Sequence, residues 1–87
     1  MARVVFTANL QRHVDCRAAE VAGATVREAL DNVFRRNERL PGYVLDDQAA
    51  LHRHMAIVVD GKPLSDRIGL SDPVAESSAI YVLQAGG

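Results

Sequence analysis

The chain has 87 residues, 48% of them hydrophobic, which is enough for one packed core and too few for two domains. Ten basic and eleven acidic residues give a net charge of -1, so there is no basic excess to favour nucleic acid. The single cysteine excludes an internal disulfide and a thiolate zinc site, and no apolar run approaches membrane-spanning length. The start of the chain enters a strand pattern directly, which favours a cytoplasmic protein.

Two strand patterns begin the chain. Residues 3–10 are rich in β-branched and aromatic side chains, and Val4, Phe6 and Ala8 would share one face. A second strand is expected around residues 13–19, where small apolar and charged side chains alternate. Two consecutive strands joined by a short loop predict a hairpin.

The best-marked element is a helix that begins at Thr25. Thr25 and Glu28 fit a capping box, in which each side chain satisfies a free backbone N–H. Pro41-Gly42 is expected to stop the helix. Its mostly apolar stripe, at helical spacing, consists of Val26, Leu30, Val33, Phe34 and Asn37. Its other face carries an i, i+4 charge ladder of Arg27, Asp31 and Arg35.

The second half of the chain predicts further strands. A short strand at residues 43–45 is one interpretation of an ambiguous stretch. Residues 55–59 are apolar on both faces, as in a central strand, and Asp60-Gly61 then signals a hairpin turn into a short edge strand at 62–64. Residues 79–83 form the last strand. The intervening loop is expected to pack three apolar side chains inward, namely Ile68, Leu70 and Val74.

This element order predicts an α+β fold of two layers. One main helix would lie across a face of a mixed sheet of four or five strands. The first and last strands would be neighbours at the sheet centre, so that the last strand is held rigidly while the residues after it project into solvent.

The chain ends in Gln84-Ala85-Gly86-Gly87. A terminal glycine pair presents a free carboxylate on a stem without side chains, which can enter a channel too narrow for a Cβ atom. The alternative interpretation is a frayed end without a role.

Three stretches together resemble the ThiS/MoaD family of β-grasp, ubiquitin-like sulfur carriers. Residues 24–30 are similar to the family's helix entry, residues 51–61 to its central strand and turn, and residues 85–87 to its tail. The resemblance implies a single β-grasp domain over residues 1–87, in which residues 84–87 form a flexible Gly-Gly tail.

The resemblance also implies a function. An E1-like enzyme would adenylate the Gly87 carboxylate with ATP, and a sulfur donor would convert it to a thiocarboxylate. Gly86 and Ala85 would insert with it into the partner, and a biosynthetic enzyme would accept the sulfur. The chain itself would need no catalytic residue, bound cofactor or metal.

Three other functions remain open at this point. The chain could be the small subunit of a synthase such as molybdopterin synthase, with its tail held permanently in a larger subunit. It could be a protein modifier joined through Gly87 to substrate lysines. It could also be a β-grasp interaction module whose tail is inert.

Other residues that could carry chemistry favour ordinary roles. Cys16 is expected to be a small core residue, and the histidines are expected to lie at the surface or at a partner contact, because no spacing specifies a metal site. The histidines are His13, His52 and His54. Basic side chains that could flank a docking face are Arg35, Arg36, Arg39, Arg53 and Lys62. The apolar residues from which strand register would select that face are Phe6, Leu10, Ile57, Tyr81 and Leu83.

Overall fold

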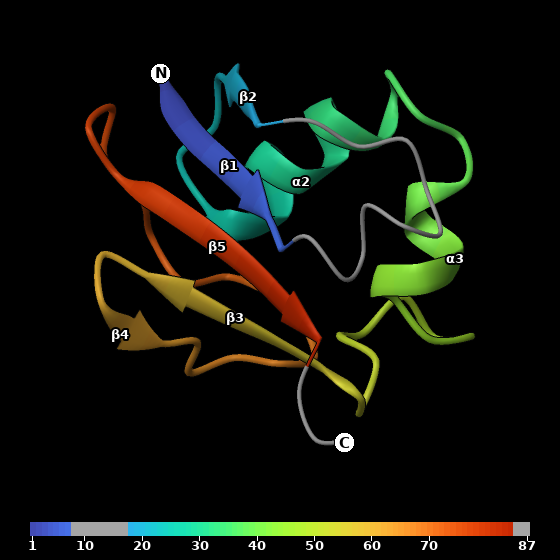
Figure 1. The fold of residues 1–87 in the computed structure, drawn as a ribbon. Helices are drawn as coiled ribbons and strands as arrows, with labels where there is room; N and C mark the ends of the chain where they lie inside the picture. Colours follow the sequence, from blue (N-terminus) through green and yellow to red (C-terminus); the bar gives the residue numbers. More distant parts are fainter. Residues whose placement is uncertain (8–17, 85–87) are drawn as a thin grey trace.

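The computed structural model describes residues 1–7 and 18–84, which form a sheet with helices packed on it (Figure 1). The elements in chain order are β1 (Ala2–Phe6), β2 (Ala19–Val21), α2 (Val26–Phe34), α3 (Leu40–Val44), β3 (Met55–Val59), β4 (Lys62–Pro63) and β5 (Ala79–Gln84). The five strands follow the order β2-β1-β5-β3-β4, with β1 and β5 parallel and the other pairs antiparallel. The predicted α+β architecture and the central pairing of the first and last strands are confirmed.

The core lies between α2 and one face of the sheet. Along β5, Ile80 and Val82 are fully buried whereas Tyr81 between them is 44% exposed, so alternate side chains face the core. Val4 and Phe6 are buried on the same face of β1, as predicted, and Ala8 lies outside the described residues. Of the predicted stripe, the helix buries Val26, Leu30 and Val33, and Phe34 packs partly buried against the core. Ala29 is also buried, and Asn37 lies beyond the end of α2.

The second strand lies later in the sequence than predicted. β2 spans Ala19–Val21 and pairs antiparallel with β1, with Val21 opposite Ala2. Val21 is only 2% exposed, so the pairing places the β-branched residue in the core. The predicted strand at 13–19 therefore overlaps β2 only at Ala19, and residues 13–17 lie outside the described residues.

The helix begins as predicted, with a different reciprocal bond. The Thr25 side chain accepts a hydrogen bond from the Glu28 backbone N–H at 3.2 Å. Glu28 Oε1 accepts from the N–H of Ala24, at 3.0 Å, and thus reaches the residue before the cap. The capping interaction at Thr25 is confirmed, and the glutamate extends it one residue outward.

The predicted role of Pro41-Gly42 as a helix stop is wrong. α2 already ends at Phe34, and Pro41 lies in the first turn of α3. A proline is tolerated there because first-turn N–H groups have no partner within the helix. The predicted strand at residues 43–45 is also wrong. Tyr43 and Val44 belong to α3, and Leu45 forms an isolated β-bridge with Leu51.

Arg27 was predicted to pair with Asp31 in a charge ladder, but its guanidinium is bonded to backbone carbonyls of other segments. Its guanidinium donates hydrogen bonds to the backbone carbonyls of Ala49, Ile68 and Gly69. These carbonyls belong to two loops that are distant in sequence from each other. Arg27 therefore ties α2 to both loops, and its stem is half-buried in the process.

The hairpin between β3 and β4 is confirmed. Asp60 and Gly61 both have positive φ, 50° and 83°, as a two-residue type I′ turn requires. The Asp60 carboxylate accepts hydrogen bonds from the Ala79 backbone N–H and the Ser78 hydroxyl, at 2.9 and 2.8 Å, and these bonds lower its pKa. The turn is thereby joined to the start of β5.

The loop between β4 and β5 folds around the carboxylate of Asp66. Leu70 is fully buried and Val74 packs against the core, as predicted, but Ile68 is 78% exposed and that prediction is wrong. The backbone N–H groups of Ile68 and Gly69 both point at Asp66 Oδ1, which turns the Ile68 side chain outward. The hydroxyl of Ser71 donates to Oδ2 at 2.6 Å.

Replacement of Asp66 by asparagine is expected to lower stability at neutral pH. The Ser71 hydroxyl, the Gly69 N–H and further backbone donors lower the pKa of Asp66 from 3.8 to about 2, so the fold favours the carboxylate form. Its contribution is present above about pH 4 and is lost as the pH falls toward 2. Urea unfolding of D66N should show a lower midpoint at neutral pH and a weaker dependence on pH between these values. The exposed Asp47 supplies the matched control, D47N, with an unchanged midpoint.

Candidate functional site

The tail begins at the end of a strand that is held on both sides. Gln84, the last described residue of β5, is the register partner of Met55 in β3. On the other side, the Thr7 backbone N–H donates to the Val82 carbonyl at 3.2 Å. Ala85, Gly86 and Gly87 lie outside the described residues, so their expected roles stay predictions. What the structure fixes is the place at which the tail starts.

The sheet presents an outer face on the side away from α2. In its middle, the register aligns Val5, Tyr81, Val58 and Pro63 in one row across β1, β5, β3 and β4. Leu83 and Ala56 form the next row, at the end where the tail begins. Tyr81 is 44% exposed, and Val5, Val58, Ala56 and Leu83 are half-buried.

The strand register divides the apolar residues considered for a docking face between the outer face and the core. Tyr81 and Leu83 lie on the outer face. Phe6 and Ile57 are each only 2% exposed and belong to the core. Leu10 lies outside the described residues, as do Cys16 and His13. The middle and tail-end rows of the outer face are therefore apolar, with Tyr81 in the middle row, and the row at the other end carries the charged Arg3 and Glu20.

A turn of three basic residues lies beside the start of the tail. His52, Arg53 and His54 immediately precede β3, in a turn closed by the Met55 N–H, which donates to the His52 carbonyl at 2.8 Å. The His52 and His54 rings lie 5.2 Å apart between centroids, and the His54 backbone N–H donates to His52 Nδ1 at 3.1 Å. The two rings are thus close together in this turn. Across residues 1–7 and 18–84, no group of three His, Cys, Asp or Glu side chains is placed to hold a metal.

Three other basic residues considered for a docking face lie elsewhere, namely Lys62, Arg35 and Arg36. Lys62 follows the β3–β4 turn, whose Asp60 contacts Ala79 at the start of β5. Arg36 lines a hollow with Met1 and Glu20, also at the end of the sheet where β5 starts. Arg53, by contrast, is two residues before Met55, which pairs with Gln84.

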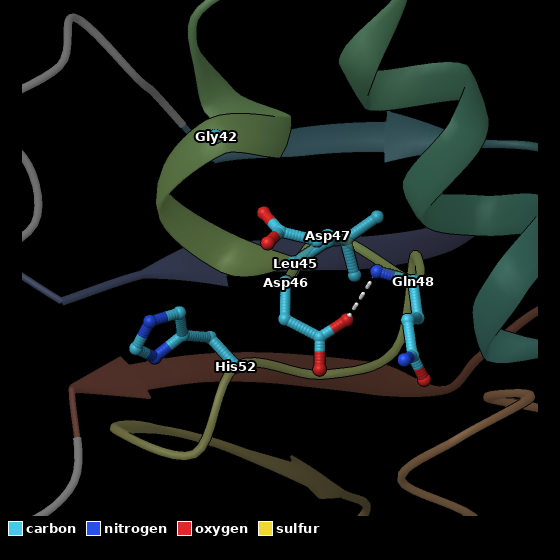
Figure 2. Close-up of a pocket in the computed structure, with 6 residues that line it drawn as sticks. All are labelled: Gly42, Leu45, Asp46, Asp47, Gln48 and His52. Carbon is cyan, nitrogen blue, oxygen red and sulfur yellow. Dashed lines mark hydrogen bonds between the residues drawn. The ribbon is translucent and has the colours of Figure 1, made fainter.

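A hollow of about 470 Å³ lies next to α3 (Figure 2). Its lining residues are Gly42, Leu45, Asp46, Asp47, Gln48 and His52. Asp46 Oδ1 accepts hydrogen bonds from the backbone N–H groups of Gln48 and Ala50, at 2.8 and 3.1 Å. This carboxylate therefore holds its own loop, as an Asx turn does, and the hollow is a product of that loop's shape.

No helix among the described residues has both the length and the apolar character needed to cross a membrane.

The sheet order, with a parallel central pair and one main helix on one face, defines the β-grasp (ubiquitin-like) fold, and solved structures agree. A chain of the Amycolatopsis orientalis BexX/CysO complex superposes with a TM-score of 0.83 at 24% identity, covering 100% of this chain and 98% of that one. SAMP1 from Haloferax volcanii superposes with a TM-score of 0.81 at 22% identity, covering 99% of this chain and 98% of that one. Mycobacterium tuberculosis CysO, described as an antigen, superposes with a TM-score of 0.82 at 18% identity, covering 99% of this chain and 100% of that one.

Comparisons with protein-family models and with curated protein sequences find no match. The likeness to solved structures establishes the fold, and the β-grasp architecture expected from the sequence is confirmed.

Proposed function

We propose that this protein is a cytoplasmic sulfur carrier that is active as a thiocarboxylate on Gly87. The observation that carries the proposal is the position of β5. This strand lies between β1 and β3 in the sheet, and the sequence continues from its last residue into Ala85, Gly86 and Gly87. The rest of the fold then serves to hold out a carboxylate that a partner enzyme can reach.

The proposed chemistry takes place at the C-terminal carboxylate. A carboxylate oxygen attacks the α-phosphorus of ATP in an E1-like enzyme, pyrophosphate leaves, and an acyl-adenylate forms. A nucleophilic sulfur from a donor then attacks the carbonyl carbon, and AMP leaves with the electron pair of the broken C–O bond. Where that sulfur is the outer atom of a donor persulfide, an acyl disulfide forms. A thiol of the donor then attacks the donor-side sulfur, a disulfide forms on the donor, and the thiocarboxylate leaves with sulfur in place of one carboxylate oxygen. ATP belongs to the partner, and the carrier supplies the reacting carboxylate and the docking surface.

The outer sheet face is the proposed docking surface for these partners. Its middle and tail-end rows are apolar, and the end row lies next to Gln84, so a partner that covers these rows also receives the tail. Aromatic residues at the centre of such a surface carry much of the binding energy.

Replacement of Tyr81 by alanine is expected to weaken binding to the activating enzyme roughly tenfold or more, since central aromatic anchors are worth about 2 kcal/mol. Tyr43 gives the matched control, because it is also exposed, at 38% against 44%, and belongs to α3 rather than to the sheet. Titration calorimetry should place Y43A within about twofold of the unsubstituted protein. Equal losses for Y81A and Y43A would move the docking surface away from the sheet.

The function is tested by intact mass. The chain is incubated with ATP, a sulfur source and the E1-like enzyme of the same cell, and one oxygen of the C-terminal residue should be replaced by sulfur. Omission of ATP should prevent the change. If the mass is unchanged with the cognate enzyme, the chain is not a sulfur carrier.

A protein modifier is the second candidate, because the similar structures include one named small archaeal modifier protein 1. Its chemistry begins in the same way, but a lysine amine attacks the activated Gly87 carbonyl in place of sulfur. Adducts of higher mass that disappear when Gly87 is removed would favour this function.

A further inference from the structure

We propose that the basic turn formed by His52, Arg53 and His54 recognises an acidic rim around the channel of the activating enzyme that takes the tail. This inference rests on the proposed function and adds to it the charge of the partner surface. Arg53 is the specificity-determining residue in this proposal.

The position of the turn is the first argument. Met55 and Gln84 are register partners in β3 and β5, so the turn that ends at Met55 lies beside the first residue of the tail segment. Three residues follow Gln84, and at 3.3–3.6 Å per residue they extend at most about 10 Å. When Gly87 lies at that depth in a partner, Arg53 is at the entrance and not at the reacting carboxylate.

The turn is also held firmly from the inside. Arg67 Nη2 donates hydrogen bonds to the carbonyls of His52 and Met55, at 3.1 and 2.8 Å. The Arg67 carbonyl in turn accepts from the N–H of Leu51 at 2.7 Å, and the His52 N–H donates to the Val44 carbonyl at 2.9 Å. Because these bonds use backbone groups at both ends of the turn, its shape is set before any partner binds.

The exposed groups of the turn are suited to an acidic surface. Arg53 and His54 are exposed, and the Arg53 Nε–H donates to His54 Nε2 at 3.3 Å. This contact orients the guanidinium, whose terminal N–H donors can meet a carboxylate in the bidentate arrangement that arginine favours.

Charge reversal at Arg53 tests the proposal. The assay is ATP–pyrophosphate exchange by the E1-like enzyme of the same cell, with the carrier as variable substrate. R53E should raise the KM for the carrier about tenfold while kcat stays within about twofold, because the rim contact steers and docks but does not touch the reacting atoms. Added salt should raise the KM of the unsubstituted carrier and have little effect on R53E. R53K should retain most of the affinity.

The matched control is R36E, which makes the same charge change on an exposed residue at the other end of the sheet. Its KM should stay within about twofold of the unsubstituted value, and thermal melting should be unchanged for both variants. Equal KM values for R53E and R36E would overturn the inference, as would a loss confined to kcat. If the enzyme does not adenylate the unsubstituted carrier at all, the proposed function itself fails, which is a different result.

Discussion

Removal of Gly86 and Gly87 is expected to abolish adenylation and to leave the fold unchanged. The shortened chain still ends in a carboxylate, on Ala85, but that carboxylate lies about 7 Å short of its former reach at 3.3–3.6 Å per residue. A misplacement of even 1 Å at a reacting centre can cost about 10²-fold in rate. ATP–pyrophosphate exchange should therefore fall at least about 100-fold.

A variant of unchanged length distinguishes the reach of the tail from its steric fit in the partner's channel. G87A keeps the number of residues and adds one Cβ at the reacting end, so it should be impaired through channel width alone. Thermal melting should be the same for both variants and the unsubstituted chain, since β5 is complete at Gln84. If the shortened chain were adenylated normally, the tail would be inert and the protein would be an interaction module.

Replacement of Gly23 by alanine is expected to produce a large loss of stability. A Cβ at this position would lie 2.7 Å from the backbone nitrogen of Ala29 and 3.0 Å from its Cα. Both atoms belong to the backbone of α2, so relief requires a shift of the helix or of the segment after β2. Overpacking of this kind costs about 1–3 kcal/mol, and the rigidity of a helix backbone favours the upper part of that range.

Gly42 provides a control with the opposite expected sign. A Cβ built there has no heavy atom within 4 Å, and the residue lies inside α3. G42A should therefore stabilise the protein by about 0.5–1 kcal/mol, because alanine loses less backbone entropy than glycine in a helix. Urea unfolding of the two variants tests the expected loss of stability in G23A and the expected gain in G42A. A neutral G23A would mean that the link between β2 and α2 adapts freely, contrary to the contact distances.

Local signals in the sequence were sufficient for most of the architecture. Thr25 predicted the start of α2 because a cap depends on neighbouring residues, and Asp60-Gly61 predicted the hairpin because its turn type needs positive φ. Strand β2 was misplaced because a short edge strand takes its register from its partner, which a local pattern does not contain. The same reasoning explains Tyr43, where a helix of one turn depends on packing rather than on its own sequence.

The site could be predicted only where it depends on sequence alone. The tail was visible as a motif, and the choice of Tyr81 and Leu83 over Phe6 and Ile57 for the outer face needed the register of β5. Arg67 could not be found, because its guanidinium serves backbone carbonyls, and such acceptors are present at every residue. Only the folded chain shows which of them it meets.

The parallel pairing of β1 and β5 has a mechanical consequence. Under the proposed function, a partner that draws in or releases the tail would apply force along β5. This direction is parallel to β1 and β3, the strands to which β5 is hydrogen-bonded on its two sides. Such a force shears the bonds between the strands, so many of them share the load at once instead of opening one after another. Under the proposed function, the sheet would therefore resist a pull on the tail during loading and discharge.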